Sequence, residues 1–420
     1  MEEKRFSYPK TFLLGFGFFG VSIIWALYNA FVPLILDRQF GLSAFWIGIF
    51  MVLDNLAAVL IQPWVGTWSD RLRTPLGRRL PFILAGAPFA AIAFGLIPLS
   101  STLPLFVLSA TTLLISLAFW RTPVIALMPD ITPSAYRSQA NGIINFMGGL
   151  ASVISFAVGS QLYAKNPNYA FWMGSALVTL SAILVLIFIR EPKEYSLKEE
   201  QASERPNVWK SITNVFAEEE GSAKRMLLAI LFWFLSWYAI ETFFTLYAVK
   251  HLLLTEADAA FQLTYVSLIF LIFAIPSGYI AAKFGRKRTI ITGILLMIVS
   301  LGLMYVLPPS FSVGERIASV TKNAGIYPVS FILMLAGFAW SLININSLPM
   351  VVDMTTDENL GTYTGLYYFS SQTAAVVGPL AFGAAVQLSG NNYNLMMLIS
   401  PIFLLFALLM MVGVKRGEAK

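Results

Sequence analysis

Long apolar runs separated by short polar stretches dominate the pattern of this chain. Twelve such runs, each about 20 residues long, can be marked off along it, at 11–36, 44–66, 81–99, 104–128, 139–163, 169–190, 226–249, 259–282, 289–307, 327–349, 361–388 and 392–414. A helix needs about 20 apolar residues to cross the hydrocarbon of a bilayer, so each run predicts one membrane-spanning helix. The pattern therefore predicts an all-α membrane protein of twelve transmembrane helices in two six-helix bundles.

The division into two bundles rests on the longest charged stretch, which lies between the sixth and seventh runs. We expect residues 1–190 to form an N-terminal bundle, 191–224 a cytoplasmic linker, and 225–420 a C-terminal bundle. The halves also match weakly at a constant spacing, because Trp25 and Trp237, like Gly66 and Gly278, are 212 residues apart. Such a repeat is typical of transporters built from two related halves.

Composition and charge agree with a membrane protein. Hydrophobic residues make up 57% of the chain and charged residues only 12%, whereas a soluble domain has about 25% charged residues. Of the 28 Lys and Arg residues, 22 fall on the side of the predicted helices that carries both termini, and five on the other side. The positive-inside rule places both termini in the cytoplasm of a plasma (cell inner) membrane protein. This asymmetry explains the basicity without a nucleic-acid partner.

Several kinds of chemistry are excluded by residue usage. The chain has no cysteine and a single histidine, His251, so disulfides, iron–sulfur clusters and histidine-based metal sites are not expected. No nucleophile–base set or nucleotide-binding loop is present, which argues against an enzyme. We predict neither a cofactor nor a metal site, and we expect a monomer embedded in the lipid bilayer, with the first run as the targeting element.

Three charged residues interrupt the apolar runs: Asp54, Arg121 and Glu241. A charge in the middle of a membrane costs about 2.5 to 3.5 kcal/mol on insertion scales, so such residues are candidates for function. Helical rise puts Asp54 and Glu241 at similar depths, about 18 and 22 Å from the inner end. One added proton makes the set of three neutral, so we predict that Asp54 or Glu241 carries a transported proton tuned by Arg121. Sodium bound by carboxylate and amide oxygens, and purely structural ties between helices, are the alternatives.

A motif between the second and third runs, "GTWSDRLRTPLGRRLPFI" at 66–83, resembles the inner-loop signature G-x-x-x-D-R-x-G-R-R of the major facilitator superfamily. Four additional residues precede its second glycine. With Gln62 and Pro63 before it, this longer form is similar to the sucrose-transporter-like and glycoside-pentoside-hexuronide branch. In the second half, "GYIAAKFGRKR", Ala282 and Lys283 replace the Asp–Arg pair. The resemblance implies a sugar symporter that works by alternating access.

The first-half motif predicts a conformational gate formed by Gly66, Asp70, Arg71, Gly77, Arg78 and Arg79. We expect the Asp70 carboxylate to accept hydrogen bonds from the first amides of a neighbouring helix and to pair with Arg78 or with basic residues across the half. A static structural role and direct contact with the substrate are the alternatives for Asp70.

The resemblance places the first, fourth, seventh and tenth runs around a central cavity, and polar and aromatic residues on these runs, with amides on the second, fifth and eleventh, predict a sugar site. An aromatic ring offers a surface for the C–H face of a sugar, and amides offer partners for its hydroxyls. The predicted binding residues are Trp25, Tyr28, Asn29, Gln62, Trp120, Asn141, Asn145, Trp237, Trp340, Asn344, Asn346 and Gln372.

Together these observations favour proton-coupled symport of a sugar or glycoside. Sodium-coupled sugar symport and an efflux antiporter of sugars or drugs remain as alternative transport functions. A non-transporting sensor or lipid-handling protein is the rival from another class.

Overall fold

The computed structural model describes residues 7–132, 136–191, 220–313, 316–355 and 359–418, so most of the predicted linker lies outside the described residues. Within these ranges, twelve helices are long and apolar enough to cross a membrane, which confirms the predicted fold class. The main helices are α1 (Tyr8–Arg38), α2 (Ala44–Arg71), α3 (Leu80–Leu96), α4 (Leu103–Ile131), α5 (Arg137–Ile154), α7 (Pro167–Phe188), α9 (Ser222–Lys250), α10 (Glu256–Phe284), α11 (Arg286–Val306), α13 (Pro328–Val352), α14 (Leu360–Leu388) and α15 (Leu395–Val412).

Short elements complete the spans and their connections. The fifth span continues beyond α5 through a π-helical turn, Ser155–Gly159, into α6 (Ser160–Lys165). The connection from α11 to α13 holds α12 (Pro309–Ser312) and an antiparallel hairpin of β1 (Ala318–Thr321) and β2 (Ala324–Ile326).

The chain divides into two compact units. Unit 1 comprises Met1–Gly41 and Leu53–Glu199, and unit 2 comprises Leu42–Val52 and Glu200–Lys420. The first turns of α2 thus belong to unit 2, where glycines let them meet α14 backbone to backbone. A Cβ atom on Gly48 would lie 2.6 Å from the Pro379 carbonyl oxygen, and one on Gly383 would lie 2.7 Å from the Ala44 carbonyl oxygen.

In unit 1, α1 packs against α5 and α7, while α3 packs against α4 and α7. The centre of this bundle contains Trp120, which is fully buried. Its ring lies close to the Cα of Gly20 and its backbone lies against Gly86, because neither glycine has a side chain to hold the helices apart.

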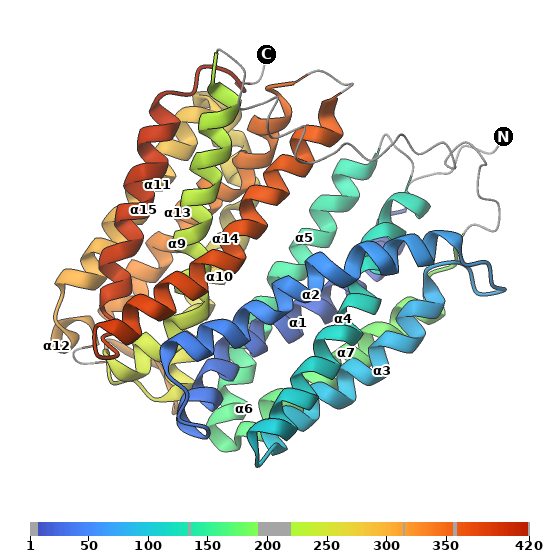
Figure 1. The fold of residues 1–420 in the computed structure, drawn as a ribbon, viewed down its shortest axis with the longest axis horizontal. Coiled ribbons are helices and arrows are strands. Elements are labelled where there is room, and N and C mark those ends of the chain that lie inside the picture. Colours follow the sequence, from blue (N-terminus) through green and yellow to red (C-terminus); the bar gives the residue numbers. More distant parts are fainter. Residues whose placement is uncertain (1–6, 133–135, 192–219, 314–315, 356–358, 419–420) are drawn as a thin grey trace. The chain divides into compact units, whose positions relative to one another are not determined.

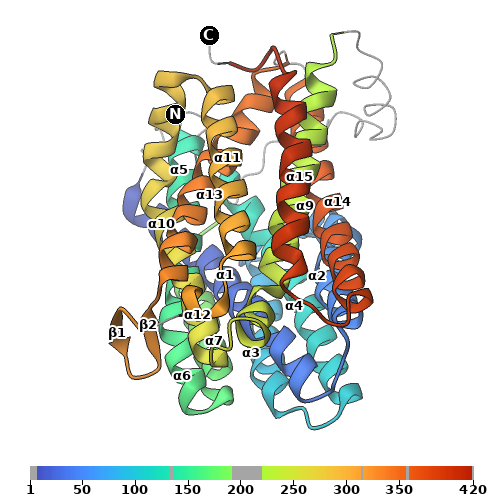
Figure 2. The same ribbon diagram turned by 90° about the vertical axis from the view of Figure 1, so that its left-hand side faces the viewer.

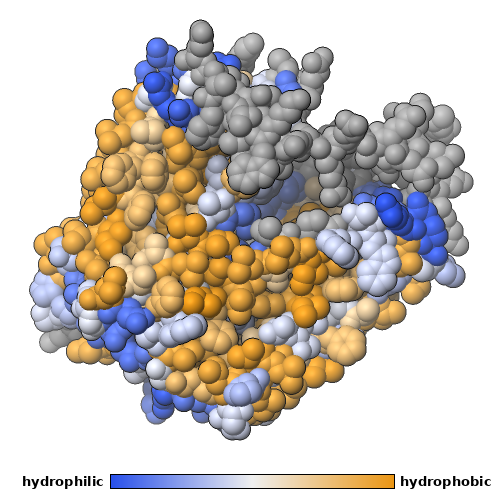
Figure 3. Space-filling model, viewed as in Figure 1, coloured by the Kyte–Doolittle hydropathy of each residue, from blue (hydrophilic) through white to orange (hydrophobic). Residues whose placement is uncertain are grey.

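In unit 2, α9 packs against α14 and α15, and α13 packs against α10 and α11 (Figure 2). Both units leave large apolar side chains exposed on the flanks of their helices, such as Leu60, Trp64 and Ile275, which are 67%, 81% and 72% exposed. Figure 3 shows hydrophobic residues covering much of the visible face, with hydrophilic residues gathered near its ends. This is the surface expected of helices solvated by lipid.

Candidate functional site

The carboxylate of Asp54 is buried within α2, where the residue is 5% exposed. Its Oδ1 accepts hydrogen bonds from the Asn55 backbone N–H at 2.5 Å and from Asn55 Nδ2 at 2.7 Å. Tyr28 of α1, another predicted residue, is also buried in unit 1.

Arg121 of α4 lies over the ring of Trp25 of α1, with Cζ 5.4 Å from the ring centroid. This is a cation–π distance. The Trp25 indole N–H is buried and has no hydrogen-bond partner among the described residues. Asn29, one turn further along α1, is half-buried. The structure thus brings Arg121 and Trp25, two of the predicted residues, together inside the spans.

In unit 2, the predicted residues Trp237 of α9 and Trp340 of α13 stack face to face, with centroids 4.0 Å apart and planes within 2°. Phe234 meets Trp340 edge-on at 5.4 Å. Trp340 is 5% exposed, whereas Trp237 is half-buried. We call these two stacked rings the Trp237–Trp340 platform. Stacking holds both rings in place, and Trp237 is the more accessible of the two.

Polar groups flank this platform. Glu241 and Asn344 lie four residues after Trp237 and Trp340 respectively, so each shares a helix face with its tryptophan. Both are half-buried. Since α13 runs opposite to α9 after three reversals of the chain, the carboxylate and the amide extend from the stack in opposite directions along the bundle. Gln372 of α14 is half-buried, and its Oε1 has no partner among the described residues.

Other predicted binding residues have packing roles. Trp120 fills the interior of unit 1. Asn346 is 3% exposed, and its Nδ2 donates to Ser277 Oγ and to the Leu342 carbonyl, both at 2.9 Å, so it ties α13 to α10. In this structure the Trp120 ring and the Asn346 amide are both used between helices and are not exposed to a ligand.

The remaining predicted polar residues stand apart from these groups. Asn141 and Asn145 are exposed on α5, and Asn145 Nδ2 donates to the Asn141 carbonyl at 2.8 Å. Gln62 of α2 is half-buried.

The predicted gate is an ion network at one end of unit 1, with its two arginines, Arg78 and Arg79, buried and Asp70 exposed. Asp130, at the end of α4, accepts from Arg78 Nη2 at 2.6 Å and from Arg79 Nε at 3.0 Å. Arg79 Nη2 also pairs with Asp70 at 2.5 Å. The expected pairing of Asp70 with Arg78 is wrong, because Arg78 turns to Asp130. Arg71, at the end of α2, is exposed, and a Cβ atom on Gly66 would lie 3.5 Å from Thr122 Cγ2.

Sequence reasoning missed the residue that caps α3. The carboxylate of Glu191, just beyond α7, accepts the backbone N–H groups of Arg78, Arg79 and Leu80 at 2.8, 2.8 and 2.6 Å. The prediction assigned that role to Asp70. Gly77, at φ +114°, turns the chain so that these amides face Glu191. We call Asp70, Arg78, Arg79, Asp130 and Glu191 the unit 1 charge cluster.

Unit 2 repeats this arrangement in a more exposed form. Gly285, at φ +92°, precedes α11, whose first amides, from Arg286 and Lys287, donate to Glu418 at 2.7 and 3.1 Å. The Arg286 side chain pairs with Asp353 at the end of α13. We call these four charged residues the unit 2 charge cluster. The available sequence signal was that Asp353 lies in the second half where Asp130 lies in the first, and that Glu418 follows the last span as Glu191 follows the sixth.

Comparison with known proteins places this geometry in a family context. Residues 13–416 match the family described as "MFS/sugar transport protein". The class B tetracycline resistance protein of Escherichia coli is 23% identical over 347 residues, covering 80% of this chain and 77% of that protein. The sucrose transport protein SUT4 of Oryza sativa subsp. indica is 28% identical over 166 residues, covering 34% of this chain and only 27% of that protein.

Two solved structures share the fold. The nucleoside transporter NupG superimposes with a TM-score of 0.73 at 15% identity, covering 97% of this chain and all of that one. A bacterial homologue of the human lysosomal transporter Spinster gives 0.71 at 14% identity, covering 97% of each chain. At these identities the likeness shows the fold alone.

Proposed function

This chain belongs to the MFS/sugar transport protein family, and on that premise we propose that it couples symport of a sugar or glycoside to a proton by alternating access. The protein is a multi-pass membrane transporter and not an enzyme, in keeping with its family and its relatives. The printed names of relatives include sucrose transport proteins, which supports a sugar as the substrate.

The observation that carries the proposal is the pairing of ionisable and aromatic groups within the spans. Asp54 is buried in unit 1, and Arg121 lies over Trp25. An ionised carboxylate is costly in an apolar bundle, and a proton removes that cost. In this proposal Asp54 or Glu241 takes up the proton, and Arg121 adjusts the balance of charge.

The sugar site is assigned to the Trp237–Trp340 platform and the polar groups around it. A pyranose has an apolar C–H face that packs on an aromatic ring, while hydroxyls extend from its rim. Trp237 offers the ring face, and Glu241 and Asn344 offer hydrogen-bond partners on opposite sides of it.

The unit 1 charge cluster is proposed as the gate, because its members join the end of α2, the start of α3 and the end of α4. With the positive-inside rule, this end faces the cytoplasm, together with both termini. We further propose that the protein acts as a monomer in the plasma (cell inner) membrane.

Reconstituted proteoliposomes test the proposal. An imposed inward proton gradient should drive accumulation of a labelled disaccharide or glycoside without sodium, and Asp54→Asn or Glu241→Gln should abolish accumulation while leaving counterflow. Glu256→Gln, at the start of α10 outside the apolar core, is the matched control and should accumulate sugar normally. Accumulation that requires sodium and ignores pH would contradict the proton as the coupling ion.

A second candidate, efflux antiport, is favoured by one observation: the match to the tetracycline resistance protein covers 80% of this chain. In that case everted vesicles with an acidic interior would take up sugar or drug as protons flow out of them. Loading by symport in right-side-out vesicles and none in everted vesicles would exclude it.

A further inference from the structure

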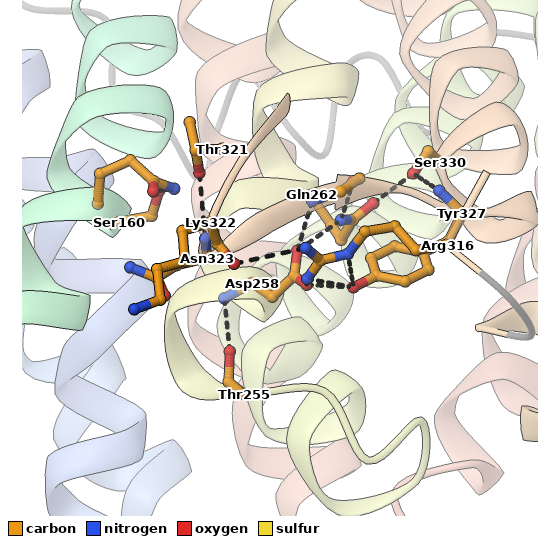
Figure 4. Close-up of polar contacts among 12 residues, drawn as sticks. Ser160, Thr255, Asp258, Gln262, Arg316, Thr321, Lys322, Asn323, Tyr327 and Ser330 are labelled. Carbon is orange, nitrogen blue, oxygen red and sulfur yellow. Dashed lines mark hydrogen bonds and ion pairs between the residues drawn. The ribbon is translucent and has the colours of Figure 1, made fainter. Parts of the chain in front are cut away.

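A buried carboxylate that the transport mechanism does not use lies at the end of unit 2 where α9 ends and α10 begins, which we call the distal end. Asp258, in the first turn of α10, is 3% exposed. Its Oδ2 accepts from the Tyr327 hydroxyl and, at 3.4 Å, from Arg316. Its Oδ1 accepts from Gln262 Nε2 at 3.1 Å and from the Gly325 N–H at 3.4 Å (Figure 4). Four donors from three parts of the chain therefore converge on one carboxylate.

These donors tie the β1–β2 hairpin to α10. Gly325, in β2, also accepts from Gln262 Nε2 at 3.1 Å and from the Tyr265 hydroxyl at 3.3 Å. The Arg316 side chain packs over the Cα of Gly325 and donates to the Tyr327 hydroxyl at 3.1 Å. The hairpin is thus held on α10 by side chains from both of its ends.

The same network reaches the start of α13. Tyr327 is the N-cap residue of α13, and its backbone N–H donates to Ser330 Oγ at 3.0 Å. Ser330 in turn donates to Gln262 Oε1 at 2.6 Å. We call Asp258, Gln262, Arg316, Tyr327 and Ser330 the hairpin clasp. It joins α10, the hairpin and α13 through hydrogen bonds that are mostly buried (Figure 4).

The clasp is one of several ties between α10 and α13 in the described part of the chain. Near the middle of the pair, the Cα of Gly337 lies against the Val266 backbone, where an added Cβ would come within 2.4 Å of the carbonyl oxygen. Towards the other end, Ser277 Oγ donates to the Ser341 carbonyl at 2.9 Å. The two helices are therefore held side by side over most of their length, and only the distal tie depends on a charge.

We propose that Asp258 is a positioning residue: through the hairpin clasp it makes α10 and α13 a single rigid pair at the distal end, and transport requires the pair to stay closed. In transporters that work by rocking, each helix bundle moves as a rigid body. If two helices of a bundle separate, the bundle bends and the rocking movement is only partly passed from one end of it to the other. The part of this inference that concerns transport rests on the proposed function. That Asp258 holds the hairpin clasp closed is independent of the proposed function.

The chemistry explains why Asp258 is required. All four contacts supply hydrogens, and a carboxylate has only acceptor oxygens to meet them. An amide at this position has only one acceptor oxygen. Its NH2 group would face donor groups of the clasp with further N–H donors, so those contacts would be lost. Asp258→Asn keeps the size of the side chain but opens the clasp, whereas Tyr327→Phe removes one donor and keeps the ring.

The absence of cysteine allows a direct test. Ala324, in β2, is fully buried, whereas Ser319, in β1, is exposed, so Ala324→Cys and Ser319→Cys each introduce a single thiol, one protected and one free. Labelling with a membrane-impermeant maleimide should be slow at Ala324→Cys. With Asp258→Asn it should become at least about tenfold faster, as expected when a buried charge-assisted bond is lost. Labelling at Ser319→Cys should stay fast in both backgrounds.

Transport is measured on the same variants. Asp258→Asn, and to a lesser degree Tyr327→Phe, should lower the maximal rate of sugar counterflow by severalfold and leave KM unchanged, because the proposed binding residues lie elsewhere. Unchanged protection of Ala324→Cys, or faster labelling with a normal maximal rate, would overturn the inference. If the unaltered chain moves no sugar, the proposed function fails, and the labelling still decides whether Asp258 closes the clasp.

Discussion

The capping of α3 by Glu191 offers the sharpest test of the unit 1 charge cluster. Glu191 Oε1 accepts the N–H groups of Arg79 and Leu80, and Oε2 accepts that of Arg78. Glu191→Gln retains the shape of the side chain and a single acceptor oxygen. That oxygen can satisfy two amides, while the new NH2 group faces the third N–H with another donor.

The expected loss follows from these contacts. A hydrogen bond to a charged group contributes about 1.5 to 3 kcal/mol, and a negative charge at a helix N-terminus adds about 0.3 to 1 kcal/mol. Because Glu191 is 9% exposed, water replaces little of this. Glu191→Gln should therefore destabilise unit 1 by about 2 to 4 kcal/mol. Glu418→Gln alters the same kind of cap at an exposed residue, so its cost should stay within about 1 kcal/mol.

The two variants are each other's controls. Thermal unfolding of the purified transporter, followed by tryptophan fluorescence in one detergent, should show a clear fall in Tm for Glu191→Gln and a much smaller fall for Glu418→Gln. Equal shifts would refute the reasoning, because they would mean that burial does not set the strength of the cap. A Glu191→Gln protein as stable as the unaltered one would refute the cap itself.

Three further predictions concern single positions. Gly77→Ala should cost about 1 to 3 kcal/mol, because φ is +114° and a Cβ would lie 2.5 Å from Glu191 Cδ, whereas Gly142→Ala, with no such neighbour within 4 Å, should leave Tm unchanged. Trp237→Leu should raise the KM of sugar counterflow about tenfold, because the ring face is lost. Trp237→Phe keeps a smaller ring and should give a KM between those of the unaltered chain and Trp237→Leu. Burial lowers the pKa of His251 from its usual 6.5, so the folded state favours the neutral ring. The folded state therefore loses stability as the pH falls below 6.5, because the unfolded chain takes up the proton more readily. His251→Gln should reduce the drop in Tm between about pH 7.5 and pH 5.5.

The twelve helices were predictable because a membrane span depends on local hydropathy alone. The partners within the site were not, since they depend on which helices are neighbours and on how each is rotated. The spans are apolar on all sides, so residue type does not reveal which face is inward. Trp120 and Asn346 were therefore assigned to the sugar, although both are used between helices. Trp237 and Trp340 were found by the repeat and by residue type, but their stacking was not.

Glu191 was missed for a different reason. It lies 113 residues from the amide of Arg78 that it caps, in a charged stretch where nothing distinguishes it from other carboxylates. Asp70 was the nearer acid in the motif and was given the role instead. The correction could have come from the repeat, since Glu418 follows the last span as Glu191 follows the sixth.

The two charge clusters share a plan but differ in burial, and that difference has a mechanical consequence. In unit 1, Arg78 and Arg79 are 7% and 5% exposed and the Asp130 side chain is 10% exposed, so the pairs with Asp130 are little screened and breaking one would leave a buried charge. The pair of Arg79 with Asp70 is weaker, because the Asp70 side chain is 54% exposed. In unit 2, the Arg286 and Asp353 side chains are 20% and 36% exposed, and water can take the place of either partner. The unit 1 cluster is therefore the stiffer of the two, because its shared carboxylate, Asp130, is shielded from water and that of Asp353 is not.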